Sequence, residues 1–483
     1  MKISAQFNLG VTQQELDFID IDTSEDIPLF LDPFLLSIRQ DQWSLNASRT
    51  IRGFFQYLIE LLNVNRIEDA RDLFNYLGEP NETCLGISQG LPRGRGVGEE
   101  DAIEIFENLL ESRAVESGLV EDLEDCVIFV DNFGKDKLSD MTTNIIRKHL
   151  IEYTHKQCRL WGIPLTNNVP SGYYWSRENV RWESSLTEML VVDGKVILLV
   201  PKAIVSYSKN YSYEKYHQHF VLNFLQREHL TLNSVLVKRK VLRNGTEKVW
   251  VSKKDIKEYE APCTKEFIRE FTQRHPSVYE DFTNHVKRIH EPLMHEELNA
   301  GYDVNTFVEY LIHKLEQIPP GRTNANEYHK HIVGILAYIF YPNLSSPQLE
   351  REIHEGRKRI DIVFDNSADK GFFYRFPNRF DLPAQFIYVE CKNYSSDPEN
   401  PELDQLSGRF SWQRGKLGFL LCRSINNLNL FINRCKDTYN DGRGVIIPIV
   451  DNELIFLLNS IKDGNLDSVD TFLDGRVREI VLR

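Results

Sequence analysis

Two short apolar segments of the sequence carry charged side chains that could do chemistry together. The segment "RIDIVFDN" holds Asp361 between two isoleucines, and "FIYVECKNY" ends its apolar run with Glu390, Cys391 and Lys392. Residues two apart on a strand share one face, so Glu390 and Lys392 point the same way and Cys391 points into the packing on the other side. If the two strands are neighbours, Asp361 can meet Glu390 across them.

Two carboxylates at one place suit a hard cation such as Mg²⁺, which takes one or two carboxylates together with water and phosphate oxygens. A lysine ammonium beside them can orient the attacking water or offset charge that grows on the phosphate. That chemistry is phosphodiester hydrolysis. The alternative is a buried ion pair with a purely structural role, although buried carboxylates on adjacent strands are costly without a counter-ion. The spacing alone leaves both interpretations open.

The elements that must position these residues follow one another from about residue 301 onward. The order is a helix, three strands, a helix, a strand, a helix and a strand. The first helix, "NANEYHKHIVGILAYIFYP", is closed by Pro342, and the second, "PELDQLSGRFSWQRG", is bounded by Pro401 and Gly415. Strands that alternate with helices predict a mixed sheet covered by helices.

This region, roughly residues 320–455 and about a third of the chain, resembles the PD-(D/E)xK nuclease superfamily, the fold of many restriction endonucleases. That superfamily carries an Asp on the second strand of its core and a Glu-x-Lys on the third. Asp361, Glu390 and Lys392 match those positions one by one. The resemblance implies that Asp361 and Glu390 bind Mg²⁺, with Mn²⁺ as a substitute, and that Lys392 acts on the water or the phosphate.

The resemblance also implies roles for two helix residues. Glu327, in "NEYHKH", matches the acid that superfamily members often carry on the first helix, which makes it a further candidate metal ligand. Gln405, in "ELDQLSGRF", matches a glutamine of Mrr-like nucleases that helps to position the metal site or the strand. For both, an ordinary solvated helix residue is the open alternative.

The sequence departs from the superfamily's pattern in two places. Ile360 precedes the Asp where the motif has Pro, and Asp365 and Glu355 are the nearest acids if another one supplies the ligand. The segment between the Asp and the Glu is long and contains "DKGFFYRFPNRFDLP". It is either a nucleic-acid contact through Arg375 and Arg379 or a hairpin extension that covers the core, and we favour the second.

Two further stretches suggest phosphate binding. "KRKVLRNG" is the strongest basic cluster outside the nuclease-like region, and its Lys238, Arg239 and Lys240 could follow a phosphate backbone. A solvated charged face is an equally good interpretation of these residues. "GLPRGRGVGEED", residues 90–101, places arginines and glycines before a helix, but a flexible surface loop is favoured over a phosphate site.

Composition bounds the class of protein. The 483 residues suggest about three domains, and 41% hydrophobic with 27% charged residues is a globular balance. No apolar run is long enough for a transmembrane helix, and "MKISAQFNLG" is not a signal peptide. The seven scattered cysteines are typical of reduced thiols. We therefore expect a cytoplasmic protein without a membrane partner. A net charge of −14 argues against a protein that simply coats nucleic acid.

We expect an α/β (α+β multi-domain) chain with three parts. These are a large N-terminal α+β sensing or recognition domain, a Lys-rich and mostly helical connecting segment, and a restriction-endonuclease-like mixed sheet flanked by helices, at residues 1–235, 236–305 and 306–483.

The expected function is a metal-dependent endonuclease that acts on nucleic acid, DNA rather than RNA. A lone nuclease on a large unfamiliar domain is analogous to bacterial restriction and anti-phage defence effectors, whose partners would include a second copy or another defence protein. The alternatives are a catalytically inactive binding or regulatory protein of nuclease fold and a DNA-repair or RNA-processing nuclease.

Overall fold

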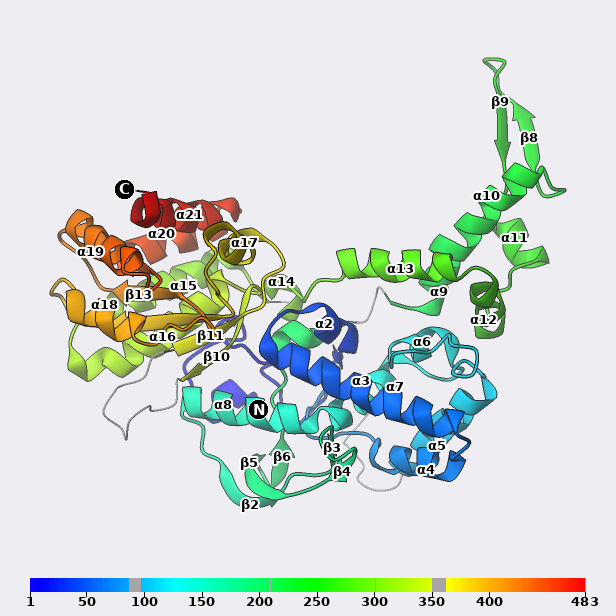
Figure 1. Cartoon of the computed structure of the whole chain (residues 1–483), viewed down its shortest axis with the longest axis horizontal. Coiled ribbons are helices and arrows are strands. Elements are labelled where there is room, and N and C mark those ends of the chain that lie inside the picture. Colours follow the sequence, from blue (N-terminus) through cyan, green and yellow to red (C-terminus); the bar gives the residue numbers. More distant parts are fainter. Residues whose placement is uncertain (87–96, 208–210, 300, 350–361, 483) are drawn as a thin grey trace.

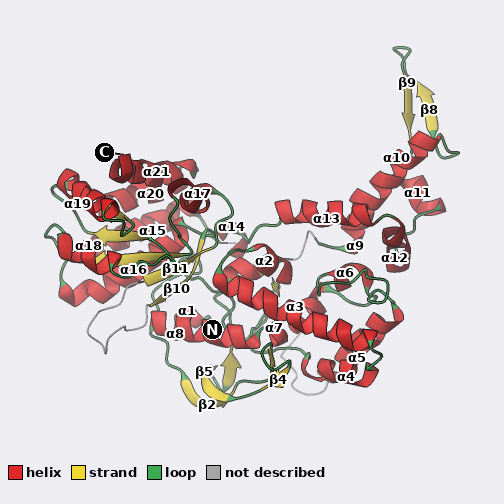
Figure 2. Cartoon of the chain, viewed as in Figure 1, coloured by secondary structure: helices red, strands yellow, loops and turns green. Residues whose placement is uncertain are grey.

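The chain forms a body and an arm that projects from it (Figure 1). The body contains a region of N-terminal helices and small sheets beside a C-terminal sheet covered by helices, as Figure 2 shows by secondary structure. The computed structural model describes residues 1–86, 97–207, 211–299, 301–349 and 362–482. No helix in these ranges combines the length and apolar character needed to cross a membrane.

The N-terminal region is organised around the long helix α3 (Gln42–Asn63). Asp41 caps this helix by accepting the backbone N–H of Ser44 at 2.8 Å. Its buried residues recur at helical spacing, which gives the helix one apolar face toward the core: Trp43, Ala47, Ile51, Phe54, Phe55, Leu58 and Leu61. The other elements of this region are α1 (Ile3–Gln6), β1 (Phe30–Leu31), α2 (Pro33–Ile38), α4 (Ile67–Asp72), η1 (Leu73–Tyr76), α5 (Val97–Glu111), α6 (Asp125–Phe129), α7 (Lys135–Ile145), α8 (Arg147–Trp161), β2 (Thr166–Pro170), β3 (Tyr174–Ser176), β4 (Arg181–Glu183), β5 (Leu186–Val192), β6 (Lys195–Ile197), η2 (Lys202–Ile204) and β7 (Val205–Ser206).

The small sheets of this region are antiparallel and pair as β2-β5-β6, β3-β4 and β1-β7. Strands β5 and β6 are joined by Asp193 and Gly194, whose φ angles are 49° and 78°. Two consecutive positive φ values are those of a type I′ turn, which favours Asp-Gly in two-residue hairpins. The dipeptide is therefore a hairpin signal that can be read directly from the sequence.

The arm extends away from the body and ends in a β-hairpin at its tip (Figure 1). It begins before residue 236, because three consecutive helical elements that precede this position lie along it. The elements are α9 (Tyr213–Tyr216), η3 (His217–Val221), α10 (Leu222–Leu232), β8 (Lys238–Val241), β9 (Glu247–Trp250), α11 (Lys253–Tyr259), α12 (Lys265–Arg274) and α13 (Pro276–Ile289). Helix α14 (His295–Leu298) follows on the way back to the body.

The C-terminal part is a five-stranded mixed sheet with the order β10-β11-β12-β13-β14. The first three strands pair antiparallel and the last two add in parallel. The strands are β10 (Leu344–Leu349), β11 (Ile362–Asn366), β12 (Phe386–Lys392), β13 (Leu417–Cys422) and β14 (Val445–Val450). The helices are α15 (Val304–Gln317), η4 (Arg322–Asn324), α16 (Ala325–Ile339), α17 (Gly371–Phe380), α18 (Asn400–Ser407), α19 (Leu428–Asn440), α20 (Asp451–Lys462) and α21 (Asp467–Leu482). The mixed sheet with flanking helices is thus as the sequence predicts, and α17 is an additional helix between β11 and β12.

The two faces of strand β12 are covered by different helices. Val389 pairs with Phe419 of β13, and the Phe419 ring stacks on Phe340 just after α16, with the ring centroids 5.6 Å apart. Because side chains alternate along a strand, Glu390 points to the opposite face, where Gln405 of α18 contacts it. The alternation predicted for the Glu-Cys-Lys tripeptide therefore holds.

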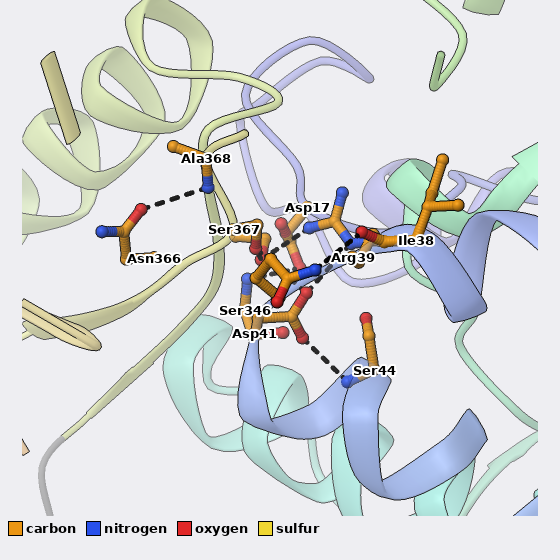
Figure 3. Close-up of polar contacts among 11 residues, drawn as sticks. Asp17, Ile38, Arg39, Asp41, Ser44, Ser346, Asn366, Ser367 and Ala368 are labelled. Atoms are coloured by element: carbon orange, nitrogen blue, oxygen red, sulfur yellow. Dashed lines mark hydrogen bonds and ion pairs between the residues drawn. The ribbon is translucent and has the colours of Figure 1, made fainter. Parts of the chain in front are cut away.

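The N-terminal region meets the C-terminal sheet through buried polar side chains (Figure 3). Arg39 Nη2 donates to Ser345 Oγ of β10 at 3.0 Å, and its Nε pairs with Asp41 Oδ2 at 3.0 Å. Ser367 Oγ, just after β11, donates to the same Asp41 oxygen at 3.1 Å. Arg39 and Asp41 are both buried. Two distant parts of the sequence thus share one hydrogen-bonded junction.

Asp365 of β11, next to this junction, makes the free energy of unfolding of the chain depend on pH. It is buried, its Oδ1 has no hydrogen-bond partner among the described residues, and burial followed by the Asp41 carboxylate raises its pKa to about 8. Between the ordinary pKa of Asp and about 8 the folded chain binds more protons than the unfolded chain, so this group lowers stability as pH rises through that window.

We expect Asp365→Asn to be more stable than the wild type at pH 8 by at least about 1 kcal/mol, since one pKa unit corresponds to about 1.4 kcal/mol. Urea unfolding at pH 5 and pH 8 measures this. The variant should show a flatter dependence on pH than the wild type, and an unchanged slope would contradict the buried-carboxylate interpretation.

Candidate active site

Glu390 lies at the centre of a polar cluster near the carboxyl end of β12. Its side chain is 4% exposed. Lys392 Nζ is 2.5 Å from Glu390 Oε1, and Gln405 Nε2 donates to the same oxygen at 3.0 Å. Lys392 Nζ also donates to Gln405 Oε1 at 3.4 Å. The structure therefore brings together three of the residues that the sequence singles out.

Glu390 lies among two cations and one further acid. Burial raises the pKa of Glu390, and the charge and hydrogen bond of Lys392 partly oppose that shift. Arg409, just after α18, places Nη1 3.5 Å from Glu390 Oε2. The Glu402 carboxylate lies near enough to raise the pKa of Glu390 further. Lys392 and Arg409 are thus matched by two carboxylates, Glu390 and Glu402.

Asp361 lies outside the described residues, so its position relative to Glu390 is not part of the structure. The described part of β11 begins at Ile362, which pairs with Val389 of β12. In the sequence, Asp361 is the neighbour of Ile362 and Glu390 is the neighbour of Val389. Glu355, the other nearby acid, also lies outside the described residues.

The residues present fit a hard cation in one respect. Glu390 Oε2 is buried and makes no hydrogen bond within the described ranges, although Arg409 Nη1 lies 3.5 Å from it, and a carboxylate oxygen that accepts no hydrogen bond can serve as a ligand for Mg²⁺. No group of three or more His, Cys, Asp or Glu residues that could hold a metal occurs within those ranges. Mg²⁺ binds through only one or two carboxylates plus water and phosphate, so Glu390 with one further acid would suffice.

Two further acids suggested by the sequence lie at different places in the sheet region. Glu327 is exposed in the first turn of α16. It lies two residues before His329, whose Nε2 is 2.9 Å from the backbone oxygen of Cys391, so this turn of α16 is near the end of β12. Asp365 pairs with Phe386, four residues from Glu390 along the strand and therefore about 13 Å away. Asp365 belongs to the junction with the N-terminal region.

Arg375 and Arg379 lie on α17 and face acids of the same chain. Arg375 Nη2 is 3.3 Å from Asp470 and 3.0 Å from Asp474, and Arg379 Nη1 is 3.3 Å from Asp474. Phe372, Phe373 and Phe376 of α17 are buried. The placement is that of a helix that covers the core.

Lys238, Arg239 and Lys240 lie on β8 at the tip of the arm, away from the Glu390 cluster (Figure 1). All three side chains are exposed. The structure therefore separates these basic residues from the candidate chemistry. The glycine- and arginine-rich stretch at residues 90–101 falls mostly outside the described residues, which resume in α5 at Val97.

The sequence did not predict two neighbours of the cluster. Arg409 lies beside Glu390, and His329 contacts the backbone of β12. Arg409 follows Gln405 by four residues in "DQLSGR", but α18 ends at Ser407, so helical spacing alone does not place its side chain. His329 contacts a backbone oxygen. No pattern of residue types reports such a contact.

Gln405 hydrogen-bonds to both Glu390 and Lys392, so removing its side chain should leave both side chains less well positioned. For the metal-dependent nuclease that the resemblance implies, we expect Gln405→Ala to lower the rate of nucleic-acid cleavage by about 10- to 100-fold, the usual cost of removing a residue that supports a metal ligand. Single-turnover kinetics in Mg²⁺ measure this. Asp404→Ala, one residue away and exposed, is the matched control and should cleave at the wild-type rate. Equal rates for both variants would contradict the assignment.

Comparison with known proteins gives one result, and it concerns the N-terminal region. No curated protein and no solved structure matches the chain. One protein family, described as a domain of unknown function (DUF8370), matches residues 8–212. This span is less than half of the 483 residues and ends before the arm and the Glu390 cluster. The N-terminal region is thus similar to a domain whose function is unknown.

Proposed function

We propose that this protein is a metal-dependent nuclease whose active site contains Asp361, Glu390, Lys392 and Gln405. The observation that carries the proposal is the Glu390–Lys392–Gln405 cluster, a buried carboxylate held by an ammonium and an amide near the end of a central strand. The Glu-x-Lys spacing and the helix-and-strand order around it are those of the PD-(D/E)xK pattern. Asp361 would supply the second carboxylate.

The residues of the proposed active site would have separate roles. Asp361 and Glu390 would hold Mg²⁺, which when bound supplies Lewis-acid polarisation of the phosphate and a more acidic water. Lys392 would orient the attacking water and offset negative charge on the phosphate. Gln405 would keep Glu390 and Lys392 aligned, and Arg409 would add positive charge on the side of Glu390 Oε2.

DNA is the proposed substrate, and restriction or anti-phage defence is the proposed role. Both rest on architecture, a single nuclease-like sheet joined to a large N-terminal region, and on analogy rather than on a contact. The N-terminal region would recognise a substrate, a partner or a trigger. The buried junction in Figure 3 supports this division, because it connects that region directly to β10 and to the residue that follows β11.

A second candidate is a nucleic-acid-binding protein that has the nuclease fold but no catalytic activity. The specific observation in its favour is the direct ion pair of Glu390 with Lys392, which satisfies the carboxylate without a metal.

A cleavage assay separates the two candidates. The full chain is incubated with linear duplex, circular duplex and single-stranded DNA and with RNA, in Mg²⁺, in Mn²⁺ and in EDTA. The proposal predicts cleavage of DNA that requires the divalent metal. Binding without cleavage of any substrate in either metal would favour the inactive candidate.

A further inference from the structure

The β8–β9 hairpin at the tip of the arm is a ribbon that no described part of the chain covers. All four residues of β8 are exposed, and β9 is exposed except for the half-buried Trp250. A two-stranded ribbon that buries neither face is barely stable by itself in water. Both faces of this protruding ribbon (Figure 1) are therefore accessible to a binding partner outside the chain.

The turn at the tip is well defined. Leu242 N donates to Thr246 O at 2.8 Å, and Gly245 N donates to Leu242 O at 2.9 Å. Gly245 has φ +81°, which glycine adopts without strain. Asn244 Oδ1 accepts from Thr246 N at 3.1 Å and from its Oγ1 at 2.6 Å. The tip is therefore preorganised, which lowers the entropic cost of inserting it into a partner.

One face of the ribbon concentrates positive charge. Lys238 pairs across the strands with Trp250, and Lys240 pairs with Lys248, so these four side chains share a face. We call it the lysine face. Like charges directly opposite each other destabilise a strand pair. Lys238 has an ion pair with Asp255, but neither Lys240 nor Lys248 makes one with a described residue.

The opposite face of the ribbon is balanced. Arg239 Nη1 lies 3.7 Å from Glu247, and Val241 and Val249 occupy the remaining positions of that face. Residues 238–250 hold five cations and one acid, which are Lys238, Arg239, Lys240, Arg243 and Lys248 against Glu247. The whole chain, in contrast, has a net charge of −14. The local excess of positive charge is thus concentrated on the uncovered tip.

The lysine face continues into a groove. Trp250 lines a groove of about 750 Å³ between β9, α10 and α13, and the Lys248 ammonium lies 5.7 Å from the centre of its ring. Arg227 and Arg288 line the groove against a single acid, Asp281. The other lining residues include two histidines and three side-chain amides, His219, His285, Asn223, Gln226 and Asn284. Cations, amides and an aromatic ring together suit phosphates and bases.

We propose that the arm binds double-stranded DNA, with the β8–β9 ribbon in the major groove and Lys240 and Lys248 on phosphates. The major groove of B-form DNA admits a two-stranded ribbon, and phosphates would relieve the repulsion between the two opposed lysines. The groove beside Trp250 receives the adjoining backbone. Duplex RNA fits less well, because its major groove is deep and narrow. The inference rests on the proposed nuclease function only for the fate of the bound duplex.

Binding is measured in EDTA, so that no cleavage occurs, by fluorescence anisotropy with a DNA duplex of about 30 base pairs over about 50 to 200 mM salt. The full chain should bind, and Lys240→Ala/Lys248→Ala should weaken binding at least about tenfold and reduce the salt slope by about 2, one for each phosphate contact. Both lysines are exposed, so the double variant should fold normally. Lys148→Ala/Lys195→Ala, which changes two exposed lysines of the body, is the matched control and should bind as the wild type does.

The outcomes separate this proposal from the nuclease proposal. Equal affinity and salt slope for the lysine-face variant and the wild type would overturn the arm proposal, even if the protein cleaves DNA. Tighter binding of anionic lipid vesicles or of duplex RNA than of duplex DNA would overturn it as well. Duplex binding that depends on Lys240 and Lys248 without any cleavage would support the arm and refute the nuclease.

Discussion

Lys392→Met is expected to lower the rate of DNA cleavage by about 10²- to 10⁴-fold, the range for removing a positioned group that transfers protons or stabilises developing charge. Lys392 is the ammonium 2.5 Å from Glu390 Oε1. Met retains much of the length of the lysine stem and removes the charge, so the packing around the side chain should persist. Duplex binding in EDTA should stay at the wild-type level, because the lysine face lies on the arm.

The matched control is Lys436→Met, a half-exposed lysine of α19 that is not part of the cluster. It should cleave at the wild-type rate. The catalytic assignment fails if Lys392→Met cleaves as fast as this control. A loss of cleavage together with a loss of duplex binding would instead point to misfolding, which the unfolding midpoint of the variant reveals.

Arg39→Met is expected to destabilise the protein by about 3–5 kcal/mol, because removing one partner of a buried ion pair leaves the other charge uncompensated. Arg39 and Asp41 have side chains 7% and 2% exposed. Asp41 would keep only its bonds to Ser44 and Ser367, and Ser345 would lose the donor from Arg39. The link between the N-terminal region and the sheet would weaken at the same time.

Urea unfolding at pH 7 measures this effect, with Arg66→Met as the control. Arg66 also pairs with an aspartate, Asp69, but both side chains are about half exposed, and exposed pairs contribute little. The control should unfold at the wild-type midpoint. A wild-type midpoint for Arg39→Met would show that the junction contributes nothing to stability.

The C-terminal sheet could be predicted because its signals are local. Alternation in "FIYVECK" separates Glu390 and Lys392 from Cys391, and the proline and glycine boundaries of the helices mark where strands resume. Residue types at fixed spacing also brought Gln405 into the prediction. Glu390, Lys392 and Gln405 lie within hydrogen-bonding distance of one another, while their catalytic roles stay predictions.

The remaining features depend on contacts between distant parts of the chain. Asp365 looks like an alternative metal ligand in the sequence, but it is buried near Asp41 and Arg39, whose charges act on it from more than 300 positions earlier in the chain. Arg375 and Arg379 look free in a basic and aromatic segment, yet acids of the last helix lie against them. The exposure of the lysine face likewise follows from the projection of the arm, which no local pattern encodes.

The most direct test of the central claim is metal binding, because it needs neither a substrate nor a trigger. Calorimetric titration with Mn²⁺ compares the wild type with Glu390→Gln and Asp361→Asn. Glu327→Gln is titrated as well, because the resemblance makes Glu327 a further candidate metal ligand. The account predicts binding by the wild type that is lost or at least about tenfold weaker in the first two variants. Wild-type binding in both Glu390→Gln and Asp361→Asn, or no binding by the wild type, would contradict the claim that these two carboxylates form the metal site.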